Sequence, residues 1–168
     1  MISQSYIKSN LKRMNHKFNQ ADSNKEALFF AKMAIIELCG WIEEAMDDIV
    51  LGCSNRNLKE HKHRDFIQKE VIDRTYGFHY TKNFQKMLIT LIGMIMYEKL
   101  EKSLDKIKFE KMKAELSSLT PTRNAEAHTH IKAMRRINAP SVTLRQFEAI
   151  YEGLLDIDSK IKLMDHLR

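Results

Sequence analysis

The sequence predicts an all-α protein, an up-and-down bundle of about five to seven helices that forms a single domain over residues 1–168. Only five Gly and two Pro interrupt the 168 residues, and these are the residue types that break helices most strongly. Apolar residues recur at steps of three and four, which is the spacing of one helix face. No segment shows the alternation of a strand, and the connections between helical patterns are short.

The N-terminal third contains two predicted helices. The first covers residues 3–21, and its apolar stripe consists of Ile7, Leu11, Met14 and Phe18. The second begins at Ser23, because "SNKE" has the pattern of a capping box, in which the Glu26 side chain reaches back to the backbone at the helix start. It runs to about Val50, and we expect Gly52 to end it.

In the middle third, Asn57 is expected to cap a third helix that runs to about Arg74. An aromatic loop, "TYGFHYT", follows, and its last residue, Thr81, is expected to cap the fourth helix. The centre of that fourth helix, Met87–Met96, is apolar on every side, which predicts a place in the middle of the bundle.

The C-terminal third begins after an expected break near Asp105. Thr120-Pro121 is typical of a helix start, because proline at the first helical position gives up no hydrogen bond. This helix is expected to run to about Ile137, where "NAPS" breaks it. Thr143 and Gln146 then open the last helix.

Charge, cysteines and hydropathy narrow the class of protein. The net charge of +6 favours a polyanion such as RNA or DNA, or an acidic partner. Cys39 and Cys53 form no C-x-x-C pattern, so they indicate reduced residues of a cytoplasmic protein. The N-terminus lacks the apolar core of a signal peptide, and Met87–Met96 is about half as long as a membrane span. We therefore expect a soluble cytoplasmic protein without a membrane partner.

One short pattern occurs twice, as "RNLKEHKH" at residues 56–63 and "RNAEAHTH" at residues 123–130. Random shuffling of this composition gives only about 0.02 copies of Arg-Asn-x-x-x-His. On a helix, residues four apart lie on one face, so Asn and the first His are neighbours and the long Arg side chain can swing toward them. The second His points elsewhere.

The surroundings distinguish the two copies. In the 123–128 copy, the small Ala125 and Ala127 allow close approach of another helix or a substrate, and the expected helix start would favour phosphate. Two roles remain open for Arg123 and His128: catalysis, or capping of the helix start together with packing. The 56–61 copy lies among charged residues, so Arg56 and His61 are interpreted as solvated basic surface or an RNA-backbone contact.

The segment "LSSLTPTRNAEAHTHI" at 116–131 resembles the signature helix of HEPN-domain proteins, with its Arg, polar residue and His. In addition, "AKMAIIELCGWIEEAMDDIV" at 31–50 is similar to the long early helix of the RiboL-PSP branch of that family. The resemblance implies a HEPN-like bundle and metal-independent cleavage of RNA at a composite cleft between two protomers of a homodimer. It also implies a toxin or phage-defence setting, with a neutralising antitoxin or another defence-system component as a possible partner.

Carried onto this chain, the resemblance makes His128 a general acid or base, Arg123 the phosphate-binding cation and Asn124 the residue that orients phosphate or imidazole. The chemistry of the side chains agrees, because imidazole titrates near neutrality and a guanidinium suits phosphate. His130 stands where HEPN toxins that are silenced by nucleotide transfer carry Tyr, so we do not expect that form of inactivation here.

Further residues have two interpretations each. After the motif follow four residues that form either a basic track for RNA or a solvent-facing surface with a sequence-neutral role, namely His130, Lys132, Arg135 and Arg136. The carboxylates at 43, 44, 47 and 48 either form a solvated face, hold a metal or position the motif arginine. Aromatic side chains of the 75–81 loop either stack RNA bases or pack into the core, namely Tyr76, Phe78 and Tyr80. His61, His63 and His79 are not expected to bind a metal, because positions 61 and 63 do not face together on a helix, and no cofactor is expected.

Two main functions follow from the sequence. The first is an RNA endonuclease, in which the 2′-hydroxyl of the RNA itself is the nucleophile. The alternative is a catalytically inactive HEPN-like module that binds RNA or protein with the same basic surface. A helical subunit of a larger complex is a third, purely structural possibility.

Overall fold

The computed structural model describes residues 2–128, 130–131 and 136–165. Within these ranges it contains six α-helices, two short π-helices and no strand, which confirms the prediction of an all-α helical bundle. In chain order the elements are α1 (Ser5–Asn19), α2 (Asn24–Asn57), α3 (His61–Phe66), η1 (Ile67–Ile72), η2 (Tyr80–Phe84), α4 (Gln85–Ser103), α5 (Lys106–Ala127) and α6 (Pro140–Asp165).

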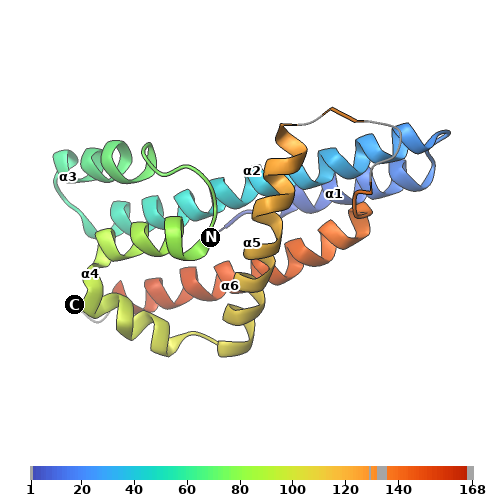
Figure 1. Cartoon of the computed structure of the whole chain (residues 1–168). Coiled ribbons are helices and arrows are strands. Elements are labelled where there is room, and N and C mark those ends of the chain that lie inside the picture. The colour runs from blue at the N-terminus through green and yellow to red at the C-terminus, as the bar shows by residue number, and fades with distance from the viewer. Residues whose placement is uncertain (1, 129, 132–135, 166–168) are drawn as a thin grey trace.

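Three helices packed against one another form the body of the molecule. Helices α1, α2 and α6 lie side by side, and α5 crosses α2 and α6 at a steep angle (Figure 1). The 34 residues of α2 make it about 50 Å long. Trp41 on α2 packs edge-to-face on Phe147 of α6, with ring centroids 5.0 Å apart. The Trp41 indole N–H donates to the carbonyl of Ser3 at 2.9 Å, which fastens the N-terminus to this face.

The capping box at the start of α2 is confirmed. The Ser23 hydroxyl accepts from the Glu26 amide at 3.2 Å, and the Glu26 carboxylate accepts from the Asp22 amide at 3.1 Å. The expected end of this helix at Gly52 is wrong, because α2 continues to Asn57. Glycine costs a helix only about 1 kcal/mol, and burial of Cys53 beyond it offsets this cost.

The region between α2 and α4 differs from the prediction. Asn57 does not cap a third helix, because it is the last residue of α2 and its amide donates to the Cys53 carbonyl at 2.9 Å. The third helix begins at His61 instead, and it passes directly into η1. The expected cap at Thr81 is wrong, because His79 caps η2 with its Nδ1, which accepts from the Lys82 amide, and η2 passes directly into α4.

Helix α4 is interrupted where the sequence is most apolar. Gly93 has φ 76° and ψ 158°, a backbone conformation that glycine adopts far more readily than other residues. The break leaves Met94 and Ile95 exposed over 61% and 75% of their surface. The prediction that Met87–Met96 lies in the middle of the bundle is therefore wrong, since only its first part is buried.

Helix α5 begins as predicted and continues past the point where a new helix was expected. The break near Asp105 is confirmed, because its carboxylate accepts from the amides of Ile107 and Lys108. Pro121, however, lies inside α5 and does not start a helix. On either side of it, the Thr120 and Thr122 hydroxyls donate to backbone carbonyls four residues earlier. These bonds and the buried face of α5 offset the helix-breaking effect of proline.

The two C-terminal helices also have other bounds than the sequence predicts. Helix α5 ends at Ala127, ten residues before the expected end at Ile137. Helix α6 begins at Pro140, where proline is well suited to the first helical position, and Thr143 is buried in its first turn. The Gln146 amide joins the two helices by donating to the Glu115 carboxylate at 3.0 Å. No helix among the described residues has the length and apolar composition needed to cross a bilayer.

Candidate functional site

The residues of the 123–128 copy occupy the C-terminal end of α5. Arg123 Nη1 donates to Asn124 Oδ1 at 3.3 Å, and the backbone N–H of His128 donates to the Asn124 carbonyl at 3.3 Å. His128 is the C-cap residue of the helix and its side chain is exposed. The spacing argument that placed Asn124 and His128 one helical turn apart is confirmed.

The electrostatic argument for this copy is wrong. Because Pro121 does not start a helix, Arg123 lies near the C-terminal end of α5 and not in its first turn. The helix dipole is negative at this end, so it offers no attraction to phosphate. Any affinity for an anion must come from the side chains.

Arg123 contacts a carboxylate of the long helix α2. Its Nη2 lies 3.7 Å from Glu43 Oε1, and both side chains are half-buried. Glu43 Oε1 is enclosed and has no hydrogen bond to any described residue. For Glu43, the structure shows the contact with the motif arginine, whereas Glu44 and Asp48 are exposed, as the solvated-face interpretation predicts.

A cavity of about 240 Å³ lies beside this pair, and we call it the motif cavity. Its lining comes from three parts of the chain: Glu43 on α2, the segment from Tyr76 to Asn83, and Thr120, Arg123 and Asn124 on α5. His128 is not part of this lining. The fold therefore brings two of the three predicted catalytic residues to one cavity and leaves the third on the surface one turn further along the helix.

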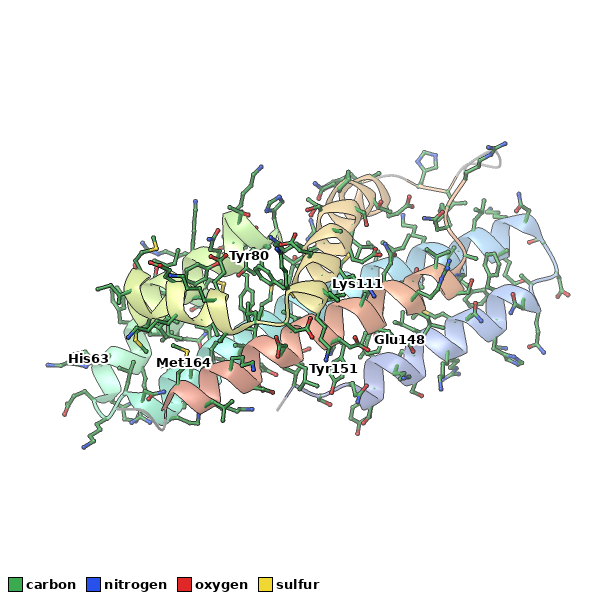
Figure 2. All side chains as sticks on the ribbon, turned by 90° about the horizontal axis from the view of Figure 1, so that it is seen from below. His63, Tyr80, Lys111, Glu148, Tyr151 and Met164 are labelled. Atoms are coloured by element: carbon green, nitrogen blue, oxygen red, sulfur yellow. The ribbon has the colours of Figure 1, made fainter. Side chains whose placement is uncertain are left out.

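The three aromatic residues of the 75–81 loop have different environments. Phe78 and Tyr80 are buried, and the Tyr80 ring packs edge-to-face on Phe109 of α5 at 5.1 Å. Figure 2 shows Tyr80 among the side chains between the helices. For these two residues the packing interpretation is confirmed. Tyr76, by contrast, has 84% of its surface exposed and lines the motif cavity.

Cys39, one of the two buried thiols of α2, is a neighbour of the same ion pair. Burial raises the pKa of Cys39 to about 12, with a smaller lowering effect of Arg123 and a raising effect of Glu43. The thiol is therefore protonated at neutral pH, and a protonated, buried thiol is a poor nucleophile.

Asp47 lies one turn beyond Glu43 on α2. Burial, together with the smaller effects of the nearby carboxylates of Glu43, Asp48, Asp73 and Glu44, raises the pKa of Asp47 from 3.8 to about 6. No group of three or more His, Cys, Asp or Glu side chains within the described ranges is arranged to hold a metal ion.

Asp47→Asn is expected to stabilise the protein at pH 8 and to have little effect at pH 4. Because the pKa of Asp47 is raised in the folded state, its contribution to stability is complete below about pH 4 and is lost as the pH rises through 6. The side chain is half-exposed, so we expect a gain of about 1 kcal/mol. Urea denaturation at both pH values measures it. Glu152→Gln, at an exposed position on α6 and not among the carboxylates that raise the pKa of Asp47, is the control. An equal gain at pH 4 would contradict the electrostatic cause.

The predicted basic track is only partly described. His130 and Arg136 are exposed and belong to no helix. The prediction that Arg136 continues the motif helix is wrong, because α5 ends at Ala127. Lys132 and Arg135 lie outside the described residues.

The 56–61 copy has a different local structure. Arg56 and Asn57 end α2, whereas His61 begins α3, so the stretch from Leu58 to Glu60 separates them. Nδ1 of His61 lies 3.8 Å from Asp65 Oδ1 in a strongly exposed pair. His63 points away from the bundle at its end (Figure 2). The repeated sequence pattern therefore does not place Arg56, Asn57 and His61 on one helix face, in agreement with the interpretation of this copy as solvated surface.

A larger cavity, of about 410 Å³, lies between α1 and α2. None of the predicted site residues lines it. We place the candidate site at the smaller motif cavity, because two of the predicted catalytic residues, Arg123 and Asn124, line it.

Several residues of the motif cavity were not predicted as part of a site, namely Gly77, His79, Lys82, Asn83 and Thr120. Gly77 and His79 belong to the 75–81 loop, which was singled out for its aromatic residues and, at His79, for a metal site that was not expected. Lys82 and Asn83 follow in η2. A signal was present in the pairing of Gly77 with Asn83, since glycine and asparagine at a loop favour a defined turn. The chain was also compared with known proteins. No protein-family model matches it, and neither a curated protein nor a solved structure does.

Proposed function

We propose that the chain is an endoribonuclease of the HEPN type that cleaves RNA without a metal ion, in a toxin or phage-defence setting. The observation that supports this proposal is the position of Arg123 and Asn124 on the wall of a cavity, with the exposed His128 one turn away on the same helix. A phosphodiester at the mouth of the cavity would meet the guanidinium and come near an imidazole.

The reaction needs only groups that the chain and RNA supply. Neutral His128 removes the proton of the 2′-hydroxyl, and the resulting oxygen attacks the adjacent phosphorus. The bond to the 5′-oxygen breaks, and that oxygen takes a proton from an imidazolium. Arg123 stabilises the negative charge that develops on the phosphate oxygens. The products are a 2′,3′-cyclic phosphate and a 5′-hydroxyl.

A homodimer supplies the second imidazole. If two α5 ends face each other, one His128 acts as the base and the partner's His128 acts as the acid. The exposed position of His128 outside the cavity lining is compatible with such an arrangement.

A catalytically inactive RNA- or protein-binding module is the second candidate. One observation favours it: in the single chain Arg123 contacts Glu43, and no imidazole of the motif lines the cavity. This module would use the same side chains for binding and would show no turnover.

The test is a cleavage assay on single-stranded RNA in excess EDTA, with analysis of the product ends. We expect wild-type protein to leave 2′,3′-cyclic phosphates and His128→Ala to be slower by a factor of about 10² to 10⁴. His61→Ala, the same substitution in the other copy, is the matched control and should leave the rate nearly unchanged. Equal losses in both variants would contradict the choice of the 123–128 copy, and RNA that is bound but never cut would favour the module.

Dilution tests the composite cleft separately. If each protomer contributes one Arg123 and one His128, specific activity should fall as the protein is diluted below the dissociation constant of the dimer. Sedimentation velocity over the same concentrations measures the population of dimers. Full specific activity in a sample that sediments as a monomer would rule out the shared cleft.

A further inference from the structure

Tyr76 differs from the other aromatic residues of its loop. Phe78 and Tyr80 are anchored in the core, whereas Tyr76 has 84% of its surface exposed while it lines the motif cavity. Large apolar rings at the surface are costly to hydrate, so an exposed ring on a cavity wall is a frequent feature of binding sites.

The backbone that presents this ring is held in place. Gly77 has φ 95°, which permits the sharp turn after Tyr76. The Asn83 side chain closes the loop from both sides: its amide donates to the Tyr76 carbonyl at 2.9 Å, and its oxygen accepts from the His79 backbone N–H at 3.1 Å. The ring of Tyr76 therefore projects from a preorganised turn, which lowers the entropy lost when a ligand binds.

Two cations share the cavity with this ring. Arg123 lines the cavity from α5, and Lys82 lines it from η2, which directly follows the loop of Tyr76. Arg123 is partly neutralised by Glu43 at 3.7 Å, whereas the Lys82 side chain is exposed and no acidic residue within the described ranges pairs with it. An aromatic face beside two cations is the combination that binds unpaired nucleotides, because bases stack and phosphates seek positive charge.

We propose that the motif cavity binds one unpaired nucleotide of single-stranded RNA, whose base stacks on Tyr76 and whose phosphate lies between Arg123 and Lys82. This inference deepens the proposed nuclease function and rests on it for the identity of the polymer. Stacking on a ring is tolerant of base identity, so the site selects single-stranded over paired RNA and does not select a sequence.

Binding can be measured apart from cleavage with a fluorescent 2′-O-methyl RNA dodecamer, which has no free 2′-hydroxyl to attack. We expect Tyr76→Ala to weaken its binding about 5- to 100-fold in anisotropy titrations. Tyr76→Phe, which retains the ring, should bind nearly as well as the wild type. Tyr6→Ala is the matched control, because Tyr6 on α1 is also 84% exposed and does not line the cavity.

Two further measurements separate stacking from a general loss of affinity. In a series of dodecamers, each lacking the base at one position, we expect one missing base to weaken binding by the wild type. The same missing base should not weaken binding by Tyr76→Ala any further, because that variant has already lost the stacking contact. Lys82→Ala should lower the slope of log affinity against log salt by about 0.7, the value for one phosphate contact on a single strand.

The outcomes distinguish this inference from the nuclease proposal. If Tyr76→Ala binds like Tyr6→Ala, or if the wild type does not bind the dodecamer, the nucleotide site is overturned even where cleavage depends on His128. If no cleavage occurs but binding depends on Tyr76, the nucleotide site stands and the protein is a binding module. If both hold, Tyr76→Ala should raise KM for RNA and leave kcat nearly unchanged.

Discussion

Replacing Arg123 with alanine is expected to slow RNA cleavage about 10²- to 10³-fold, the usual effect of removing one group that stabilises the developing charge. The guanidinium is the one permanent cation of the motif, and it reaches the cavity from a half-buried position beside Glu43. Its contribution should appear in kcat as well as in kcat/KM, because the charge on the phosphate grows in the transition state.

Arg123→Lys separates charge from geometry. Lysine keeps the charge but lacks the planar fork that contacts two phosphate oxygens at once, so we expect it to restore only a small part of the activity. Arg56→Ala, at the corresponding place in the other copy, is the control and should retain wild-type rates. A fully active Arg123→Ala protein would remove the chemical basis of the nuclease proposal.

The ion pair requires a separate measurement of stability. In Arg123→Ala the half-buried Glu43 carboxylate loses its cation, so part of any lost activity could come from a disturbed fold. Combining Arg123→Ala with Glu43→Gln removes the isolated charge. We expect the double variant to regain thermal stability but not cleavage.

Replacing Gly153 with alanine is expected to cost about 1 to 3 kcal/mol of unfolding free energy, the range for overpacking a close contact. Gly153 is buried on α6 where α5 crosses it, and an added Cβ would lie 2.5 Å from Cβ of Met112. Carbon atoms in contact are normally 3.5–4.0 Å apart. Because the clash involves a Cβ and not only a flexible side-chain end, the two helices must move apart.

This prediction is checked by thermal denaturation. A chain of this size loses about 2–4 °C of Tm for each kcal/mol, so Gly153→Ala should melt several degrees below the wild type. Gly40→Ala is the matched control: Gly40 lies on α2 with no atom within 4 Å of the added Cβ. It should gain up to about 1 kcal/mol from helix propensity alone. If both variants gain stability, the close approach of α5 and α6 is not what requires glycine at 153.

The sequence predicted those parts of the fold that depend on local patterns. The stripe from Ile7 to Phe18 predicted α1, and Ser23 with Glu26 predicted the start of α2. Both depend on residues within one or two turns of each other. The errors at Gly52 and Pro121 have one cause: a local helix breaker is overcome when the residues beyond it are buried against other helices. That burial is a property of the tertiary structure.

The candidate site was predictable to a similar extent. The spacing of Arg123, Asn124 and His128 predicted their common helix, because four residues make about one turn. It could not predict that Glu43 and the loop around Tyr76 come to the same place, since these segments meet only through the crossing of α5 over α2. The prediction also put the motif at the wrong end of its helix, because the sequence does not show that Pro121 is tolerated inside α5.

Pro121 lies immediately before the turns that bear the motif. Having no N–H, it donates nothing to the carbonyl of Ser117, so the last turns of α5 are joined to the rest by one hydrogen bond fewer. Proline positions are where helices bend most easily. A small bend at Pro121 would move the guanidinium, the amide and the imidazole together, because all three follow it within two turns at the end of α5. An RNA strand or a second subunit that binds here would then contact all three groups after one bending movement of α5.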